Sequence, residues 1–303
     1  MSVTRRIFVS LSADLWTQPN LNELKWGIVE EIKKLGYTPE IFNNPQGSPG
    51  LASAKTWNAR DADEIARRCV GAAVIGTARW VFQDDKGQPV MLPNEFNHYE
   101  GALAHTLGLP TLVLVQNDVR RRTVFDPSFG GYIGEFAPTA GVNWLHTKEF
   151  RVPFEYWEAQ LKQRRDVFLG YSSRSKATAE TVKQFIQSCG ASVLDWQEDF
   201  IPGRTILDQI EQAAALSSGG IFLFTKDDDL LDKGQVDTAI PRDNVVFEAG
   251  YFIGLKGKRS VLIIRESGSK MPADLGGDIY ASLKNKKDTA PIERTLRGFI
   301  EAL

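Results

Sequence analysis

Cysteine and histidine are scarce in this chain of 303 residues, which contains two cysteines and three histidines. Cys69 and Cys189 stand far apart in the sequence, so we expect no disulfide framework and a protein of the reducing cytoplasm. The histidines do not stand at zinc-ligand spacing from the cysteines. The composition therefore argues against a structural metal site.

Long hydrophobic runs and a strong net charge are also missing. No apolar segment approaches the roughly 20 residues that cross a bilayer, and the apolar run near the N-terminus is too short for a signal peptide. The formal net charge is −2, which gives no general attraction to nucleic acid or to an acidic membrane. We therefore expect no membrane and no direct nucleic-acid partner.

Segments with the patterns of strands and helices alternate through the first half of the chain. Strands are expected at 5–12, 37–42, 72–76 and 110–115, and helices at 21–35, 61–69 and 96–107. Residues 84–88 and 117–143 have neither periodicity and are interpreted as loops, the second as an elaboration of the first domain. Strands that alternate with helices predict a parallel sheet.

The second half repeats this plan. Strands are expected at 167–172, 192–196, 220–224 and 260–264, helices at 154–164, 177–189 and 205–215, and loops at 197–203 and 232–235. Pro93 and Glu100 are seven residues apart, as are Pro241 and Glu248. We predict an α/β protein of two tandem small doubly wound parallel-sheet domains, divided near Lys162 into 1–162 and 163–303. Ligands of such domains bind at the carboxyl ends of the strands.

The stretch 240–254, IPRDNVVFEAGYFIG, is the most informative part of the chain. Pro241 marks a turn, because proline cannot continue the ladder of a preceding strand. Asp243 or Asn244 is expected to cap the helix that follows, by accepting a hydrogen bond from a first-turn N–H.

Glu248 places one carboxylate inside this otherwise apolar helix. We expect the helix dipole and the free amides to keep it ionised. A partly buried, ionised carboxylate is suited to stabilising a positive charge that appears only in a transition state. Gly250 and Gly254 lie four residues apart on one face, which we expect to approach a sheet closely.

The run PRDNVVFE from Pro241 to Glu248, followed by GYFIG, resembles the signature of bacterial TIR-like (Toll/interleukin-1 receptor-like) nucleotide-binding domains. These domains occur as effectors of anti-phage signalling systems, including the TIR fused to bacterial STING. The resemblance covers roughly residues 164–303. It implies a TIR-like NAD+ hydrolase domain with Glu248 as the catalytic residue. The fold is then expected to be two flavodoxin-like or TIR-like units.

Cleavage of NAD+ at the nicotinamide bond passes through a ribosyl oxocarbenium-like transition state, as glycoside cleavage does. Because nicotinamide leaves as a neutral molecule, one carboxylate near the ribose and a stacking surface can carry much of the reaction. Glu248 fits the first role, with a solvated helix residue as the alternative. Trp196 and Phe200 could stack on adenine or nicotinamide. Core packing is an equal alternative for Trp196 and the favoured one for Phe200.

Polar residues near the same strand ends complete the candidate substrate site. The hydroxyls and amides of Ser172 and Ser173 could hold ribose or phosphate, although a serine-rich loop is commonly only a loop. Arg242 could bind phosphate with two hydrogen bonds or pair with the next residue, and Asn244 is included beside it. The resemblance implies that the loop with Asp227 borders the site, and a solvated acidic loop is the alternative.

The matching stretch of the first half, from Pro93 to Glu100, keeps the proline and the glutamate but lacks the arginine and the asparagine cap at the matching positions. Ser10, Asn94 and Glu100 define a candidate second pocket. This half also resembles nucleoside deoxyribosyltransferases, which use a glutamate nucleophile. Glu100 could be a second catalytic carboxylate, a remnant of one, or part of a sensor pocket. We favour the ligand-sensing role because this helix begins with more polar residues.

The leading hypothesis is an NAD+ glycohydrolase that acts as a bacterial immune effector, with nicotinamide and ADP-ribose or a cyclic isomer as products. NAD+ is then the substrate, and no cofactor is expected. A nucleotide second messenger or an activating protein is the expected trigger, and a homo-oligomer the expected assembly. The alternatives are a non-enzymatic nucleotide-binding or TIR–TIR scaffold, and a deoxyribosyltransferase-like enzyme that uses Glu100.

Overall fold

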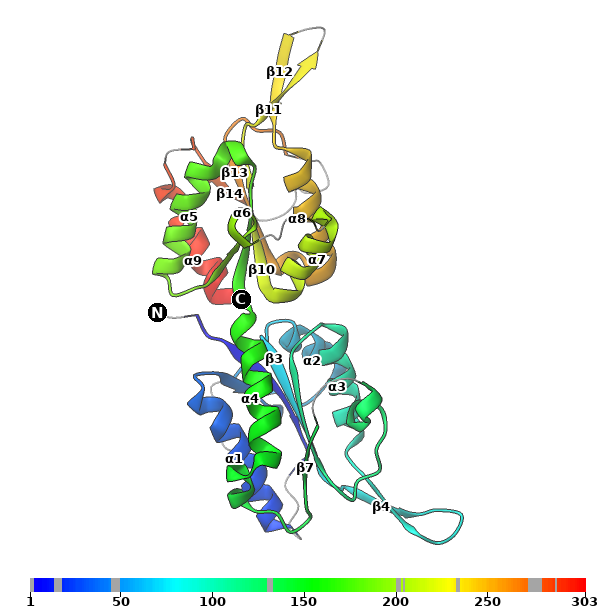
Figure 1. Cartoon of the computed structure of the whole chain (residues 1–303). Helices are drawn as coiled ribbons and strands as arrows, with labels where there is room; N and C mark the ends of the chain where they lie inside the picture. The colour runs from blue at the N-terminus through cyan, green and yellow to red at the C-terminus, as the bar shows by residue number, and fades with distance from the viewer. Residues whose placement is uncertain are drawn as a thin grey trace. The chain divides into compact units, whose positions relative to one another are not determined.

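The structure, a computed structural model, describes residues 3–13, 18–44, 50–129, 133–199, 203, 205–232, 235–271, 280–286 and 288–303. The chain divides into two compact units (Figure 1). The N-terminal unit spans 5–163, and the C-terminal unit spans 164–303 with the start of the chain. This division differs from the expected one by one residue and by the first few residues, of which Val3 packs against the C-terminal core.

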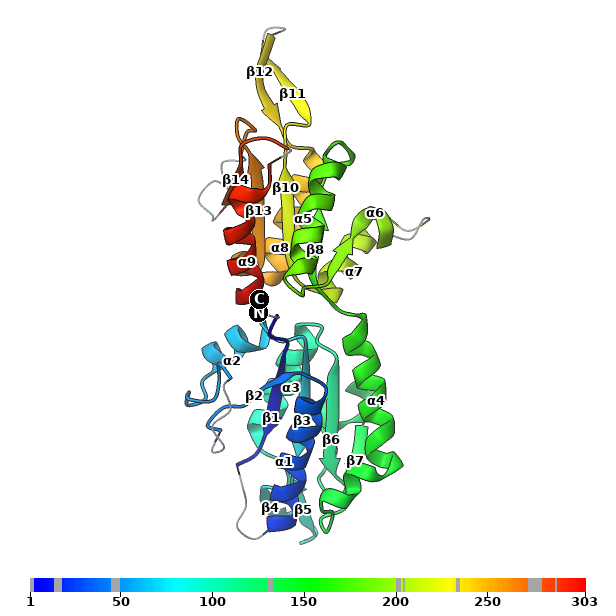
Figure 2. The ribbon, with the colours of Figure 1, turned by 90° about the vertical axis from the view of Figure 1, so that its left-hand side faces the viewer.

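The N-terminal unit is built on a five-stranded parallel sheet of order β2-β1-β3-β6-β7. The strands are β1 Arg6–Leu11, β2 Thr38–Glu40, β3 Gly71–Gly76, β6 Thr111–Gln116 and β7 Ile133–Phe136. The helices are α1 Pro19–Lys34, α2 Ala59–Ala66, α3 Glu95–Thr106 and α4 Lys148–Gln163. Helices α1 and α4 cover one face of the sheet, and α2 and α3 cover the other (Figure 2).

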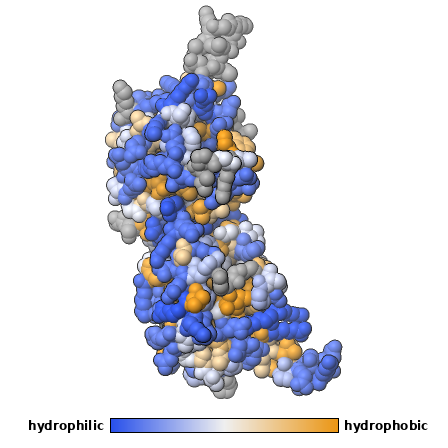
Figure 3. All heavy atoms as spheres, in the orientation of Figure 1, coloured by the Kyte–Doolittle hydropathy of each residue, from blue (hydrophilic) through white to orange (hydrophobic). Residues whose placement is uncertain are grey.

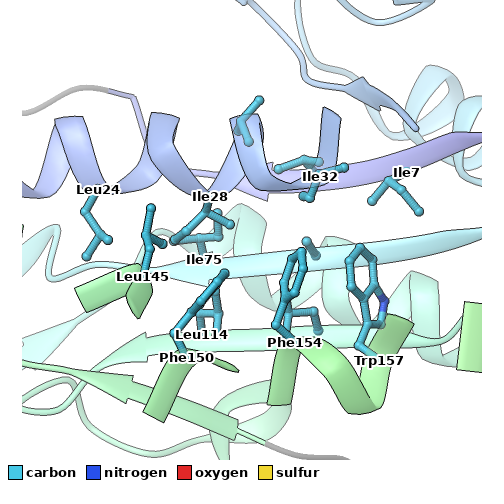
Figure 4. Close-up of a cluster of buried hydrophobic side chains, with 14 of the residues drawn as sticks. Ile7, Leu24, Ile28, Ile32, Ile75, Leu114, Leu145, Phe150, Phe154 and Trp157 are labelled. Carbon is cyan, nitrogen blue, oxygen red and sulfur yellow. The ribbon is translucent and has the colours of Figure 1, made fainter. Parts of the chain in front are cut away.

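The larger core of this unit lies under α1 and α4. Leu24, Ile28 and Ile32 of α1 meet the aromatic side chains of α4 above the sheet (Figure 4). These three positions recur at helical spacing, so one face of α1 is apolar and buries itself against the sheet. Phe150 and Phe154 of α4 stack with their ring centroids 4.9 Å apart. The helix α4 begins six residues before its expected start and contains a proline at position 153.

The C-terminal unit repeats the architecture with a parallel sheet of order β14-β13-β10-β8-β9. The strands are β8 Arg165–Gly170, β9 Val193–Asp195, β10 Ser217–Phe224, β13 Val261–Glu266 and β14 Tyr280–Leu283. The helices are α5 Lys176–Ser188, α6 Trp196–Asp199, α7 Ile206–Leu216, α8 Asp243–Lys256 and α9 Glu293–Ala302. Helices α5 and α9 cover one face, and α7 and α8 the other. The prediction of two tandem doubly wound domains is confirmed.

Both units contain an antiparallel hairpin between the central strand and the helix that follows it. In the N-terminal unit the hairpin is β4 Trp80–Gln83 with β5 Pro89–Leu92. In the C-terminal unit it is β11 Asp228–Asp232 with β12 Gln235–Ile240. The expected loop at 84–88 is confirmed, but the strands on either side of it and those of the second hairpin were not predicted. The strands are short and pair outside the main sheets, so the alternation of sheet strands and helices does not indicate them.

Two further elements depart from the sequence-based expectations. The segment 117–143 was expected to be a loop but contributes the edge strand β7. A Cβ on Gly134 in β7 would lie only 2.6 Å from Leu114 Cδ2. This strand therefore depends on a glycine that lets it approach its neighbours closely, and not on an apolar run. The first residues of the expected loop 197–203 belong to the short helix α6, and β14 and α9 were not predicted.

The expectation that Gly250 and Gly254 face the sheet is wrong. Both are exposed, and an added Cβ at either would meet no atom within 4 Å. The close approach occurs inside the sheet instead, where a Cβ on Gly219 would lie 2.6 Å from the carbonyl oxygen of Ser260. Helix α8 therefore faces the sheet through Val245, Ala249 and Phe252.

No helix in the described part of the chain is both long and apolar enough to cross a bilayer. The face of the molecule shown in Figure 3 is mostly hydrophilic, with smaller apolar areas between the polar ones.

We predict opposite stability effects for Gly219→Ala and Gly250→Ala. A methyl group on Gly219 would clash with backbone and should destabilise the protein by about 1–3 kcal/mol. A methyl group on Gly250 enters open space inside a helix, where alanine is favoured over glycine by about 0.5–1 kcal/mol. Urea unfolding of the full chain measures both. A Gly250→Ala protein as destabilised as Gly219→Ala would contradict the orientation of α8.

Candidate active site

A pocket of about 910 Å³ opens in the C-terminal unit at the carboxyl ends of β8 and β9, beside the first turn of α8. Its volume lies within the range of small-molecule and cofactor sites. Its lining comes from β8, α5, β9, α6, α7, β11 and α8 or from residues next to them: Tyr171, Ser172, Ser173, Lys176, Glu180, Asp195, Trp196, Gln197, Glu198, Ile206, Gln209, Asp228, Arg242, Asp243, Asn244, Val245 and Glu248.

Glu248 reaches this pocket from α8, where it is the sixth residue of the helix. Its side chain is 9% exposed, and its Oε2 atom is buried without a hydrogen-bond partner among the described residues. Gly170, the last residue of β8, makes room for it, because a Cβ on Gly170 would lie 3.0 Å from Oε2. A buried, unpaired carboxyl oxygen that lines a pocket is available to a ligand.

Burial raises the pKa of Glu248 from its ordinary value of 4.5 to about 7. The expectation that the helix keeps this group ionised is therefore wrong. The dipole acts within the first turn of a helix, and Glu248 lies beyond that turn without a donor. At neutral pH the carboxyl group is divided between its protonated and ionised forms. An adjacent positive charge would favour the ionised form.

The start of α8 differs from the expected cap. The N-cap residue is Arg242, without a side-chain cap hydrogen bond, so the prediction of an Asp243 or Asn244 cap is wrong. Arg242 pairs with Asp228, at 3.3 Å from Nε to Oδ2, and not with Asp243. Asn244 lines the pocket, as was proposed for it.

Trp196 contributes both to the pocket and to the core. It is the first residue of α6, lines the pocket, and packs partly against the cores on both faces of the sheet. Its ring centroid lies 5.7 Å from that of Tyr171. Trp196 therefore packs against the core and also lines the pocket, and its stacking on a substrate stays a prediction.

A hydrogen-bond network fixes the wall beside Trp196. The Tyr171 hydroxyl donates to Asp195 Oδ1 at 2.8 Å. Lys183 Nζ donates to Asp195 Oδ2 at 3.3 Å and to Glu198 at 2.6 Å. Burial, followed by the hydrogen bond to Asp195, raises the pKa of Tyr171 above its ordinary value. The hydroxyl is therefore a proton donor held in place, not an ionisable group near neutral pH.

The other predicted residues are placed differently. Ser172 and Ser173 line the pocket, whereas Asp227 does not and is 4% exposed. Burial by itself would raise the pKa of Asp227, but the polar neighbours Ser172, Lys286 and Thr225 outweigh it and lower the pKa, with hydrogen bonds from Lys286 and Thr225. Asp227 is thus a buried anchor, and its neighbour Asp228 lines the pocket instead. Phe200 lies outside the described residues.

Several lining residues were missed by the sequence analysis. Tyr171 and Asp195 stand at the carboxyl ends of β8 and β9, and their position alone could have indicated them. Asp228 belongs to the unpredicted hairpin, while Lys176 and Gln209 lie on helices and reach the pocket only through tertiary packing.

The N-terminal unit holds a related arrangement in which the Glu100 carboxyl group is hydrogen-bonded. This residue is the sixth of α3, as Glu248 is of α8, and it is 5% exposed. Trp57 Nε1 donates to Glu100 Oε1 at 2.8 Å. Burial raises the pKa of Glu100 to about 7, although hydrogen bonds with Ser10 and Trp57 act in the opposite direction.

Strand pairing shows why the two glutamates differ. Ser10 pairs with Val74 of β3, and Gly170 pairs with Phe222 of β10. Matching the central strands of the two units places Ser10 at the position of Gly170. A hydroxyl therefore reaches Glu100, whereas the matching glycine of the other unit offers Glu248 no hydrogen-bond donor and packs closely against Phe222 and the Glu248 carboxyl group.

Asn94, the third predicted residue of the second pocket, uses its side chain in a hydrogen bond at the start of its own helix. It is the N-cap of α3, and its Oδ1 accepts from the Phe96 amide at 3.1 Å. At the position that matches Asn244 the chain has Phe96, as noted above, and Asn94 caps this helix instead. Asn97 reaches the strand instead, with Nδ2 donating to Ser10 Oγ at 2.8 Å.

No group of three or more histidine, cysteine, aspartate or glutamate side chains in the described ranges is arranged to hold a metal ion.

Residues 166–285 match a protein family described as the TIR domain of CAP12/Pycsar effector proteins. The CD-NTase-associated protein 12 of Flavobacterium daejeonense is 37% identical over 114 residues, which are 37% of this chain and 35% of the relative. The Pycsar effector protein BcPycTIR of Burkholderia cepacia is 36% identical over 105 residues, 32% of each chain. The match confirms the resemblance of this half to bacterial TIR-like effector domains.

A third relative is the uncharacterized protein YuaY of Escherichia coli K12, which is 31% identical over 120 residues, 39% of this chain and 40% of the relative. The chain thus spans about a third of the length of the curated relatives that it matches.

We predict that Glu248→Gln raises the free energy of unfolding above that of the unchanged protein, and that this gain is larger at pH 8 than at pH 5. The folded-state pKa of Glu248, about 7, lies above its ordinary value of 4.5. The folded state therefore holds more protons between these values, and the stability contributed by Glu248 is lost as pH rises through this window. The shift corresponds to up to about 3 kcal/mol, and glutamine does not titrate.

Unfolding of the full chain by urea at both pH values measures this difference. Glu180→Gln is the control, because that side chain is exposed and water hydrates it in both states. A difference between Glu248→Gln and the unchanged protein that stays constant with pH would show that Glu248 is not desolvated.

Proposed function

With a TIR domain of the CAP12/Pycsar effector family in its C-terminal unit, we propose that this chain is a bacterial immune effector that cleaves NAD+. The products would be nicotinamide and ADP-ribose or a cyclic isomer. One observation carries the proposal: Glu248 presents a buried, unpaired carboxyl oxygen in a pocket of about 910 Å³.

The proposed role of Glu248 is electrostatic. As the bond between ribose and nicotinamide breaks, positive charge develops on the ribose, and an ionised carboxylate beside it lowers the energy of that state. The pKa near 7 supports this role, because the cationic nicotinamide ring of the bound substrate would favour the ionised form. Nicotinamide leaves as a neutral molecule, so the reaction needs no strong acid.

The pocket supplies the remaining contacts that the proposed reaction needs. Trp196 and Tyr171 offer aromatic faces for a planar ring. Ser172 and Ser173 offer hydroxyls for ribose. The lining contains six carboxylic side chains and only two basic ones, an excess of negative charge that suits the cationic ring of NAD+.

Glu100 is a poorer candidate for chemistry. Trp57 and Ser10 already satisfy its carboxyl group, so a substrate would have to displace them. We therefore assign the N-terminal unit a regulatory or ligand-sensing role. We carry over to this chain the CD-NTase association that the relatives' names state, and propose activation by a nucleotide second messenger or an activating protein.

Glu248→Gln should reduce NAD+ cleavage by the full chain by about 10²-fold or more, because an amide cannot offset developing positive charge. Glu100→Gln is the matched control: the same substitution at the same helix position in the other unit. It should change activation or ligand binding and leave the chemical step intact. Chromatographic separation of nicotinamide and ADP-ribose measures both. Loss of cleavage in Glu100→Gln but not in Glu248→Gln would move the active site to the N-terminal unit.

We further propose that the active form is a homo-oligomer, since soluble proteins commonly assemble with symmetry. Specific activity should then fall on dilution, in parallel with the average mass from light scattering. Constant specific activity from a protein that stays monomeric across the dilution series would reject the proposal.

A further inference from the structure

Asp228 holds two arginine side chains at the wall of the pocket. Arg174 Nη1 lies 3.1 Å from Asp228 Oδ1, and Arg242 Nε lies 3.3 Å from Asp228 Oδ2. Each carboxylate oxygen therefore faces a different guanidinium group. Arg174 also donates to the backbone carbonyl of Asp227. The aspartate thus fills the space between two cations as the oxygens of a phosphate group would.

The three side chains come from three separate elements that meet at the pocket. Arg174 lies in the short 3-10 turn Ser173–Ser175 after β8, Asp228 begins β11, and Arg242 precedes α8. Asp228 and Arg242 both line the pocket. Contacts between elements so far apart in the sequence depend on the tertiary fold, so the cluster is part of the assembled site.

The first turn of α8 adds a second feature suited to an anion. No side chain caps this helix, although it is 14 residues long and its first residues line the pocket. Uncapped first-turn amides and the helix dipole favour negative charge at this end. The unpaired Glu248 oxygen opens on the same pocket, so one ligand could place its diphosphate at the helix start and its ribose at the carboxyl group.

A diphosphate entering this pocket meets few free cations. The lining carries six acids against Lys176 and Arg242, and Asp228 already neutralises Arg242. A diphosphate therefore gains little from Arg242 unless Asp228 gives way, because repulsion from the aspartate offsets attraction to the arginine.

We propose that Asp228 is an internal anion that occupies Arg174 and Arg242 when no ligand is bound, and that the diphosphate of the dinucleotide displaces it. The inference deepens the proposed function and rests on it. Asp228 sets the affinity of the pocket for diphosphate ligands by competing for the same two cations.

The position of Asp228 links this exchange to the hairpin. Asp228 pairs with Ile240 at the base of the β11–β12 hairpin, and Arg242 follows two residues later. The Asp228–Arg242 ion pair therefore joins the two ends of the hairpin. Displacement of Asp228 breaks this ion pair, while the backbone hydrogen bond from the Asp227 amide to the Ile240 carbonyl stays in place.

Calorimetric titration of the full chain with ADP-ribose tests the inference without any cleavage step. Asp228→Asn should bind ADP-ribose about five- to tenfold more tightly than the unchanged protein, since two partly exposed ion pairs no longer compete. Glu180→Gln is the matched control, because it removes the same charge from the pocket wall and Glu180 is not paired with an arginine in the described contacts. Its gain should be clearly smaller.

Two further variants keep the test decisive. Asp228→Glu keeps the charge and should bind ADP-ribose nearly as the unchanged protein does. In a chain with Arg174→Gln and Arg242→Gln, Asp228→Asn should give no larger gain than Glu180→Gln gives in the unchanged protein, because there is no longer a cation to release. Circular dichroism and thermal melting establish that each variant is folded.

The inference is overturned if Asp228→Asn binds ADP-ribose no more tightly, if Glu180→Gln reproduces the gain, or if neither the unchanged protein nor Asp228→Asn binds it. These outcomes separate it from the proposed function. A gain in Asp228→Asn without NAD+ cleavage by the full chain supports the anion competition and rejects the glycohydrolase. Cleavage of NAD+ by the full chain, without tighter ADP-ribose binding in Asp228→Asn, supports the glycohydrolase and rejects the anion competition.

Discussion

The burial of the Glu248 carboxyl group against the end of β8 is the constraint on which the candidate site depends. It is possible only because Gly170 has no side chain to occupy the space beside Oε2. Desolvation then raises the pKa to about 7, so the group responds to a nearby positive charge at physiological pH. A buried acid without a partner destabilises the folded chain above that pH, and such a cost is characteristic of functional sites.

The two units share one fold but differ in what surrounds the buried glutamate. Both carry a glutamate at the sixth position of the helix after the hairpin, and burial raises both pKa values to about 7. In the N-terminal unit, Ser10 and Trp57 satisfy the carboxyl group. In the C-terminal unit, glycine stands at the matching strand position and the pocket is open. The two units therefore share a fold but differ in the hydrogen bonds that reach the buried glutamate.

Charge distribution organises the rest of the pocket. Its acidic lining would attract the cationic ring of the proposed substrate and repel the diphosphate. In the exchange that we propose, the diphosphate replaces Asp228 between Arg174 and Arg242, so that two arginines now paired with an aspartate would bind the ligand. Asp228 also begins the hairpin, so this cluster lies where the pocket and the hairpin meet.

The sequence by itself determined the doubly wound architecture and the repeat, because strand–helix alternation and the proline-to-glutamate spacing are local patterns. The resemblance to TIR-like domains drew attention to Glu248, whose catalytic role stays a prediction. The sequence also indicated Trp196, Ser172, Ser173, Arg242 and Asn244 as residues that the fold brings to one pocket. Only the tertiary structure decided the protonation of Glu248, the pairing of Arg242 with Asp228 and the burial of Asp227. Those properties depend on which atoms from distant segments surround a group, since desolvation and ion pairing act through space and leave no periodic trace in the chain.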